Sequence, residues 1–185
     1  DAGRGFSFMR EGRLDMRYDQ DGGVSAEEVV NSFGVPALEN ILARYGEERR
    51  ARAIAERIVR ERKRKRIRTT AELSGIVLSV KGKRKERGLH GATKTFQAIR
   101  IYVNDELGSL ERFLEKFPQW IEPGGRVAVI SFHALEDALV KNRFKELFRL
   151  GRAEHVTKKP IQAGRGEVAQ NPRARSAKLR AIKIL

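Results

Sequence analysis

The chain has 185 residues, with 39 Lys and Arg against 24 Asp and Glu, which gives a formal net charge of +15. This length predicts one domain or two, and a hydrophobic content of 40% excludes a disordered tail, so we expect a folded core. The absence of Cys excludes disulfides, Cys-ligated metals and thiol catalysis, and with only three His we predict no metal site. No apolar run approaches the roughly 20 residues of a membrane span, so we expect a cytoplasmic protein without a membrane partner.

The positive charge is concentrated in three stretches of the chain. Residues 60–68, 81–87 and 171–183 carry net charges of +6, +4 and +5, and together they account for the whole net charge. Such clusters are typical of proteins that bind a polyanion, because each base that neutralises a phosphate releases a counterion. The side chains predicted to contact a nucleic-acid backbone are Arg62, Lys63, Arg64, Lys65, Lys83, Arg84 and Lys85. A solvated surface without a partner is the alternative.

The first half of the chain predicts a loop followed by short helices. Residues 1–24 are Gly-rich and mix aromatic with charged residues, which favours an irregular loop. Capping boxes, in which Ser or Thr precedes Glu by three residues, predict helix starts at Ser25 and Thr69. Between them, Pro36 suits the first turn of a second helix, and apolar residues spaced by three and four over 51–59 predict a third. We therefore expect four amphipathic helices in a row.

The second half changes to a mixed pattern. Residues 95–117 predict one long helix, because their apolar side chains recur every three or four positions. The apolar run at 127–132 follows a Gly turn and predicts a strand buried on both faces. Helical spacing resumes over 133–150, and residues 154–158 and 178–185 are weaker strand candidates. This order of helix, strand and helix is typical of α/β proteins.

Seven motifs spread along the chain are shared with one family of bacterial enzymes, in the family's order. They are RGFSF (4–8), LDMRYD (14–19), YGEER (45–49), ATKTFQAIR (92–100) with VNDEL (103–107), PGGRVAVISFHALED (123–137), TKKP (157–160) and NPRARSAKL (171–179). On these motifs the chain resembles the RsmH family, also called MraW. The family uses S-adenosyl-L-methionine to methylate N4 of a cytosine in the decoding centre of 16S rRNA.

The resemblance implies an α/β fold: part of a Rossmann-like class I methyltransferase core with an inserted small helical domain. It assigns residues 1–24 to a loop of the core, 25–92 to the inserted domain with its basic clusters, and 93–185 to the C-terminal part of the core. A Gly-rich cofactor loop has no counterpart here, so we expect the cofactor-binding residues N-terminal to residue 1 and an incomplete enzyme in this chain alone. The implied partners are 16S rRNA in the small ribosomal subunit and a second copy in a homodimer.

Two groups of residues are predicted to surround the reacting base. His133 and Phe132 follow the apolar strand, at the end of a sheet where ligands of α/β proteins bind, so we predict that His133 is catalytic and accepts from the amine and that Phe132 stacks on the base. The alternatives are that His133 caps the next helix and that Phe132 is core. The resemblance also places the loop with Asp15, Arg17 and Asp19 beside the cofactor-binding half. We therefore predict that Asp15 is catalytic and contacts the amine, and that Arg17 and Asp19 bind the substrate, with Arg17 on a phosphate. An Asp15 and Arg17 pair that only fixes the loop is the alternative.

The C-terminal basic stretch is predicted to bind the RNA substrate through Asn171, Arg173, Arg175 and Lys178.

Two other functions remain open. A catalytically silent RNA-binding fragment would use the same bases without chemistry. A helix-turn-helix DNA binder is disfavoured, because the basic runs lack a separate recognition helix.

Overall fold

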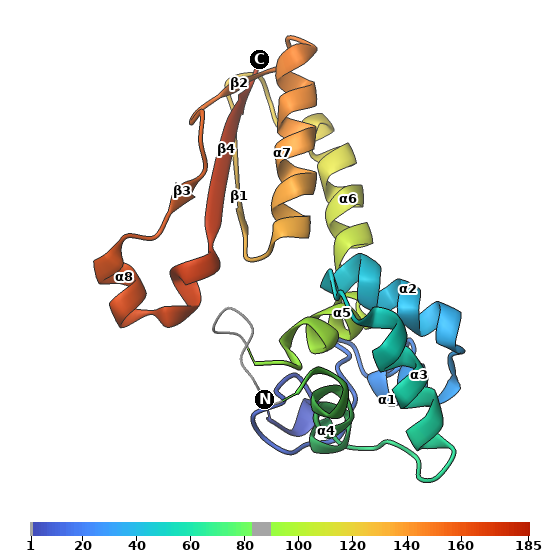
Figure 1. Ribbon diagram of the computed structural model, residues 1–185. Coiled ribbons are helices and arrows are strands. Elements are labelled where there is room, and N and C mark those ends of the chain that lie inside the picture. The colour runs from blue at the N-terminus through green and yellow to red at the C-terminus, as the bar shows by residue number, and fades with distance from the viewer. Residues whose placement is uncertain (1, 83–89) are drawn as a thin grey trace. The chain divides into compact units, whose positions relative to one another are not determined.

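The structure, a computed structural model, describes residues 2–82 and 90–185 and divides into two compact units, Asp1–Glu106 and Leu107–Leu185 (Figure 1). In chain order, with η for a 3-10 helix, the elements are η1 (Ala2–Arg4), α1 (Ala26–Ser32), α2 (Val35–Gly46), α3 (Ala51–Arg62), α4 (Thr70–Lys81), α5 (Thr93–Val103), α6 (Glu106–Lys116), η2 (Phe117–Gln119), β1 (Arg126–Ser131), α7 (Ala134–Arg149), β2 (Ala153–His155), β3 (Ile161–Gln162), α8 (Arg165–Gln170), η3 (Pro172–Ser176) and β4 (Lys178–Ile184).

The four predicted helices α1 to α4 are confirmed, and their starts follow from local hydrogen bonds. Ser25 and Glu28 form the predicted capping box of α1, in which the Glu28 amide donates to Ser25 Oγ and the Ser25 amide donates back to the Glu28 carboxylate. Thr69 and Glu72 form the same box at α4. Each box satisfies amides that a helix start otherwise leaves unpaired.

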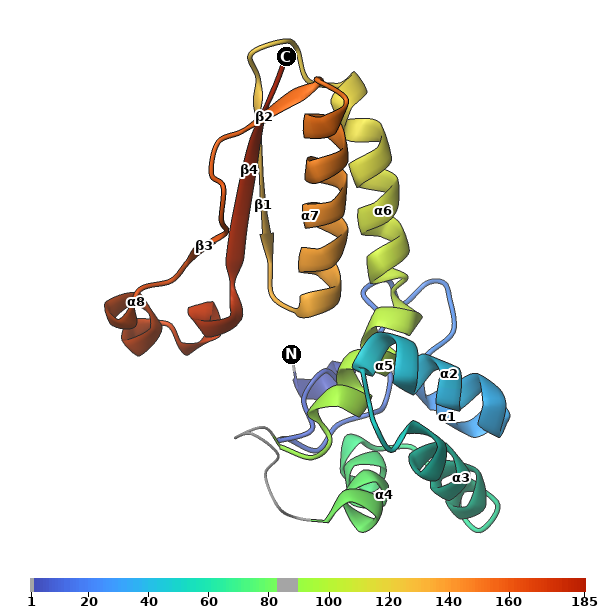
Figure 2. The ribbon, with the colours of Figure 1, turned by 45° about the horizontal axis from the view of Figure 1, so that its top comes forward.

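The helices of the first unit enclose one apolar core. α2 packs against α3 and α5, and α1 packs against α3 and α5 (Figure 2). Residues from every one of these helices are fully buried, among them Val29, Leu42, Ile54, Ile58, Leu73 and Ile99. The loop before α1 joins the same core through Leu14 and Met16, which are 0% and 1% exposed. The Leu14 amide donates to the carbonyl of Arg68, which ties this loop to the start of α4.

The prediction of one long helix over 95–117 is wrong, because two helices occupy this stretch. α5 ends at Val103 and α6 begins at Glu106. Between them Asp105 adopts a left-handed conformation, with φ of 45°, which an α-helix cannot accommodate. The side-chain amide of Asn104 holds the break by donating to the carbonyls of Met16 and Arg100.

The second unit contains a small sheet with strand order β1-β4-β2 and β3 on the side of β4. The last strand, β4, is antiparallel to both of its neighbours, with Ser131 of β1 opposite Lys178 and His155 of β2 opposite Ile182. β1 and β2 are therefore parallel to each other, and α7 connects them as the crossover helix of a βαβ unit. Both weaker strand candidates are confirmed as β2 and β4.

The prediction that β1 is buried on both faces is wrong for this chain. α7 covers the face that carries Val127 and Ile182, and the core there includes Phe144 and Leu147. Each of these large side chains contributes about 1.5–3 kcal/mol by leaving water. Residues that alternate with Val127 point to the opposite face, where Ile130 is 54% exposed, because no described residue of this unit covers it.

The domain boundaries that the resemblance implies stay a prediction. The compact units divide after Glu106, so the loop of residues 1–24 and helix α5 share a core with α1 to α4. Compactness within this chain does not assign residues 1–24, 25–92 or 93–185 to a core or an insert of a larger fold.

Candidate functional site

Asp15 and Arg17, in the loop before α1, form a closely bonded ion pair. Arg17 Nε donates to Asp15 Oδ1 at 2.8 Å and a second guanidinium nitrogen donates to Oδ2 at 3.0 Å. Met16 between them has φ of 64°, a costly conformation that turns the two side chains toward each other. The hydrogen-bonded guanidinium lowers the pKa of Asp15, although burial of the carboxyl acts in the other direction. Asp15 is therefore an ionised acceptor whose charge Arg17 already balances.

The Asp15 and Arg17 pair is therefore present as the alternative predicted, with each side chain holding the other within the loop. The predicted roles of both residues toward a substrate stay predictions. Asp19, the third residue predicted here, is exposed, and its carboxylate accepts from the amide of Asp21 in a turn. Its carboxylate makes no described hydrogen bond with Asp15 or Arg17, but its charge lies near enough to Arg17 to contribute to the raised pKa of that guanidinium, for which the hydrogen bond to Asp15 is the largest cause.

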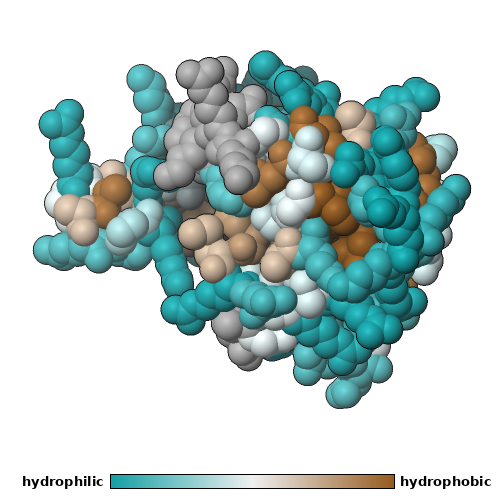
Figure 3. Space-filling model, turned by 60° about the horizontal axis from the view of Figure 1, so that its bottom comes forward, coloured by the Kyte–Doolittle hydropathy of each residue, from teal (hydrophilic) through white to brown (hydrophobic). Residues whose placement is uncertain are grey.

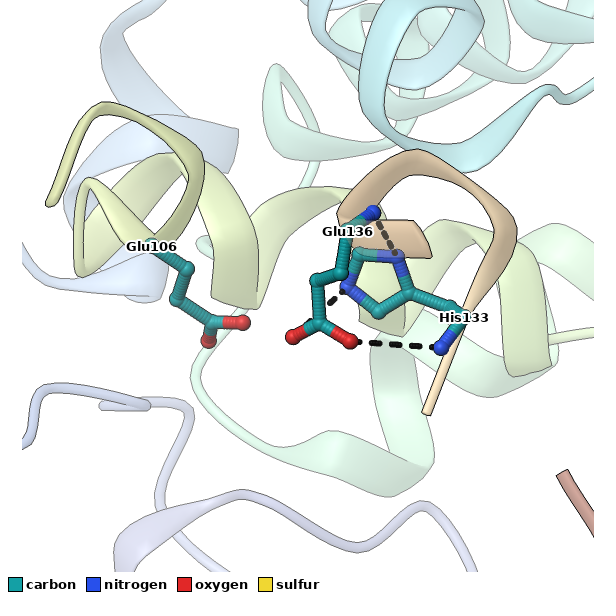
Figure 4. A group of neighbouring side chains, drawn as sticks. All are labelled: Glu106, His133 and Glu136. Carbon is teal, nitrogen blue, oxygen red and sulfur yellow. Dashed lines mark hydrogen bonds and ion pairs between the residues drawn. The ribbon is translucent and has the colours of Figure 1, made fainter. Parts of the chain in front are cut away.

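His133 lies directly after β1 and caps α7. Its Nδ1 accepts from the Glu136 amide at 3.3 Å, and its own amide donates to the Glu136 carboxylate at 3.2 Å (Figure 4). Nε2 is buried and lies 3.3 Å from Glu136 Oε1, outside hydrogen-bond geometry. Burial alone raises the pKa of Glu136, but bonds from His133 and from the Phe132 amide outweigh it and lower the pKa. His133 therefore caps α7, as the alternative predicted, and the catalytic role of His133 stays a prediction.

Phe132, next to this cap, is 53% exposed. The alternative that it belongs to the core is therefore wrong for the described part of this chain. Because Ser131 pairs with Lys178, the end of β1 lies beside the start of β4. Phe132, His133 and Lys178 are thus brought together at one end of the sheet.

Lys178 and Arg180 share one buried carboxylate. Arg180 Nε donates to Asp137 Oδ1 at 2.7 Å, and Lys178 Nζ donates to Asp137 Oδ2 at 3.2 Å. These two bases therefore attach β4 to α7 and share one negative charge. Lys178 is only partly free to bind RNA, and its predicted role in substrate binding stays a prediction.

The other C-terminal residues lie in η3 and beside it. Asn171 caps η3, since its side chain accepts from the Arg173 amide at 3.2 Å. Arg173 and Arg175 are exposed, and no described residue pairs with either guanidinium. Within the described residues, both guanidinium groups are therefore available for contact with a phosphate.

The first basic cluster divides into bases with internal partners and bases without them. Arg62 donates to the carbonyls of Val30 and Phe33, at 2.9 and 2.6 Å, and so satisfies the C-terminal end of α1. Lys65 forms an ion pair of 2.6 Å with Glu72, whose pKa this contact lowers.

Lys63 and Arg64 are exposed, and within the described ranges their side chains have no hydrogen-bond partner. Figure 3 shows a face of the molecule that is largely hydrophilic, with apolar surface between the hydrophilic side chains. The bases at Lys83, Arg84 and Lys85 lie outside the described residues.

The sequence reasoning did not single out a further set of bases in the second unit. Lys141 and Lys145 lie on one face of α7 beside the residues that follow β2. In the sequence, the spacing of four residues between Lys141 and Lys145, together with the TKKP motif at 157–160, would have indicated this set of bases. In residues 2–82 and 90–185 the structure contains no helix long and apolar enough to cross a membrane.

The sequence pattern of the MraW methylase family matches residues 1–185. The chain belongs to the MraW methylase family. The resemblance predicted from the seven motifs is confirmed, and so is the α/β fold, to which the β1-α7-β2 unit of this family member conforms.

Curated relatives are identical to this MraW family chain at about half of the aligned positions. Proteins named ribosomal RNA small subunit methyltransferase H from Elusimicrobium minutum and Persephonella marina are 52% identical over 180 and 181 residues, and one from Rippkaea orientalis is 50% identical over 178. The matches cover 97%, 97% and 96% of this chain but 61%, 62% and 57% of those proteins. The chain therefore spans about 60% of the length of these relatives.

Proposed function

We propose that this chain is the C-terminal part of a methyltransferase that transfers a methyl group from S-adenosyl-L-methionine to N4 of a cytosine in the decoding centre of 16S rRNA. The observation that carries the proposal is the family match over the whole chain, 1–185, with relatives named as small-subunit rRNA methyltransferases. A location in the cytoplasm and a homodimer follow from the same resemblance and stay predictions.

The pockets described within each unit do not fit the methyl donor. The pocket in the first unit between α3 and α4 includes Arg64 and Lys65, and the one beside α7 includes Lys141 and Lys145. The first pocket also includes Glu61 and Glu72, but bases outnumber acids in both pockets, and this excess of positive charge disfavours a sulfonium cation. We therefore propose that the methyl donor binds mainly to residues outside this chain. The role of this chain is then to bind the RNA.

Cytosine N4 is a weak nucleophile, because its lone pair is delocalised into the ring. Its methylation needs a rigidly held base more than a strong proton acceptor. In the geometry of His133, Nδ1 accepts from the Glu136 amide, so a neutral imidazole carries its proton on Nε2. Nε2 is then a donor without a described acceptor, and Nδ1 becomes available as an acceptor only if the cap of α7 opens. This arrangement favours a role for His133 in positioning the end of β1, where Phe132 offers an exposed ring.

The experiment compares His133→Ala with His133→Asn in a protein of the full length of the relatives. Asn caps helices well, so His133→Asn keeps the acceptor for the Glu136 amide but removes the imidazole, whereas His133→Ala removes both. If the imidazole takes part in methyl transfer, both variants lower the single-turnover rate on 16S rRNA by about 10²-fold or more, and only His133→Ala lowers the melting temperature. If His133 only caps α7, His133→Asn keeps the wild-type rate.

The methyl-transfer proposal itself is tested with the wild-type protein of that length. Incorporation of a labelled methyl group into a cytosine of 16S rRNA supports it, and incorporation at another base or at none overturns it. The same measurement distinguishes an enzyme from a catalytically silent RNA-binding module, because such a module would incorporate no methyl group. The exposed bases Lys63, Arg64, Arg173 and Arg175 are compatible with that alternative as well, because contacts between bases and phosphates need no catalytic chemistry.

A further inference from the structure

A pocket of about 350 Å³ lies in the second unit, between α7 and the residues that follow β2. Its volume is near the lower end of the range of about 300–1,000 Å³ that is typical of small-ligand pockets. None of the side chains predicted to meet the reacting cytosine lines it. The side chains that matter for its chemistry are Lys141, Lys145, Phe148, His155, Thr157 and Lys158.

The pocket carries positive charge that its own walls do not balance. Lys141, Lys145 and Lys158 are exposed, and in the described part of the chain none of them forms an ion pair. Arg180 also lines the pocket, but its guanidinium is bound to Asp137. Like charges four residues apart on a helix repel each other, so the Lys141 and Lys145 pair gains from an anion between its two ammonium groups.

A hydroxyl group in the same pocket has no partner. Thr157 Oγ1 is shielded from solvent and makes no hydrogen bond within the described residues. Buried polar groups are nearly always hydrogen-bonded, so an isolated hydroxyl at the wall of a pocket indicates a missing partner. A hydroxyl donates readily to an anionic oxygen, and a phosphate supplies several such oxygens.

An aromatic platform adjoins the bases. Phe148 is 52% exposed, and its ring centroid lies 4.8 Å from that of His155 with the two planes 32° apart. Exposed aromatic rings beside lysines are typical of sites that stack a nucleobase and hold its phosphate. A simple inorganic anion would leave this ring without a role.

We propose that this pocket binds a nucleotide of an RNA strand, with the phosphate against Lys141, Lys145 and Thr157 and the base against Phe148. The choice of RNA as the source of the nucleotide rests on the proposed function, whereas the match to a phosphate with an adjoining aromatic ring rests on the pocket alone. The site is an RNA contact separate from the reacting base. A free mononucleotide offers the same two groups, so the experiments separate the two sources.

The first experiment titrates the full chain, labelled with ¹⁵N, with uridine 5′-monophosphate, uridine and inorganic phosphate. The monophosphate binds more tightly than either of its parts and shifts the amide signals of α7 and of residues 155–158. Lys145→Gln and Thr157→Val weaken monophosphate and inorganic phosphate alike, by about tenfold. Phe148→Leu weakens the monophosphate by about fivefold or more and leaves inorganic phosphate unchanged. Lys159→Gln, an exposed neighbour that does not line the pocket, is the matched control and changes neither.

The second experiment repeats the comparison with a short single-stranded RNA that has hydroxyl groups at both ends. If Lys145→Gln weakens this RNA as it weakens the monophosphate, the ligand is a nucleotide within a strand. If it weakens only the monophosphate, a free nucleotide is the ligand and the RNA assignment is overturned. Equal binding of uridine and its monophosphate, or equal losses in Lys145→Gln and Lys159→Gln, overturns the site altogether. None of these measurements requires methylation, so failure of the proposed function leaves them readable.

Discussion

The guanidinium of Arg180, in β4, binds the carboxylate of Asp137, in α7, through two hydrogen bonds of 2.7 and 3.1 Å. Both side chains are largely buried, with 17% and 11% of their surface exposed. The pair joins the last strand of the sheet to its crossover helix across 43 residues of chain. Lys178 adds a third contact to the same carboxylate.

Asp137→Asn should destabilise the protein at neutral pH, by about 2 kcal/mol, because it leaves Arg180 and Lys178 without a counter-charge. The hydrogen-bonded guanidinium lowers the pKa of Asp137 in the folded state, with burial acting in the other direction. A lowered folded-state pKa stabilises the fold above the pKa of the unfolded chain, near 3.8, and this contribution is lost as pH falls further. Urea unfolding at pH 7 and near pH 3 should therefore show a difference between variant and wild type that shrinks in acid.

Glu146→Gln is the control for this variant. Glu146 pairs with Arg143 at 2.8 Å on the same helix but is 55% exposed. Exposed pairs contribute little, so the loss should stay below about 0.5 kcal/mol. A difference for Asp137→Asn that does not change with pH would show that lost packing, and not lost charge, causes it.

Gly46→Ala and Gly75→Ala should change stability in opposite directions. A Cβ atom at Gly46 would lie 2.6 Å from the carbonyl oxygen of Lys94, so α2 and α5 would have to move apart, at a cost of about 1–3 kcal/mol. A Cβ atom at Gly75, inside α4, meets nothing within 4 Å, and Ala there raises helix propensity by about 0.5–1 kcal/mol. Thermal melting of the two variants measures the sign directly, and a gain in Gly46→Ala would contradict the close packing of α2 on α5.

Thr69→Ala should lower the free energy of unfolding by about 1 kcal/mol, because the Glu72 amide loses its acceptor at the start of α4. Ser79→Ala on the same helix is the comparison. The Ser79 hydroxyl only donates back to the carbonyl of Ile76, so its loss should be neutral within about 0.5 kcal/mol. Urea titration of both variants checks this, and equal losses would mean that the capping box contributes nothing.

Lys63→Ser with Arg64→Ser should weaken RNA binding and flatten its salt dependence without a change in melting temperature. Both side chains are exposed, and each phosphate contact to a single strand contributes about 0.7 to the slope of log affinity against log salt, so two contacts contribute about 1.4. Binding is measured by fluorescence anisotropy from low to moderate salt. The control is Lys116→Ser with Arg149→Ser, which removes the same charge outside the basic clusters.

Arg62→Ser should behave differently from these two neighbours. Its guanidinium satisfies the carbonyls of Val30 and Phe33, so its loss should lower the melting temperature as well as any affinity for RNA. An unchanged melting temperature would show that these two hydrogen bonds do not stabilise the end of α1.

The elements that the sequence predicts are those whose cause is local. The capping boxes of Ser25 with Glu28 and Thr69 with Glu72 each close over three residues, so the printed sequence contains both partners side by side. The helices α1 to α4 follow for the same reason, as does α7 after His133. Each of the two candidate groups is predictable in part, because in the first unit Asp15 lies two residues from Arg17 and in the second unit His133 lies three from Glu136.

Long-range contacts decided what the sequence alone left open. The predicted long helix breaks at Asp105 because Asn104 bonds to the carbonyl of Met16, 88 positions away. Lys178, which the sequence predicted to bind RNA, is bound to Asp137 together with Arg180. In the second unit α7 covers only one face of β1. Spacing along the chain fixes which residues share a face of one element. The partner that meets this face is set by the distances between elements, which only the folded chain determines.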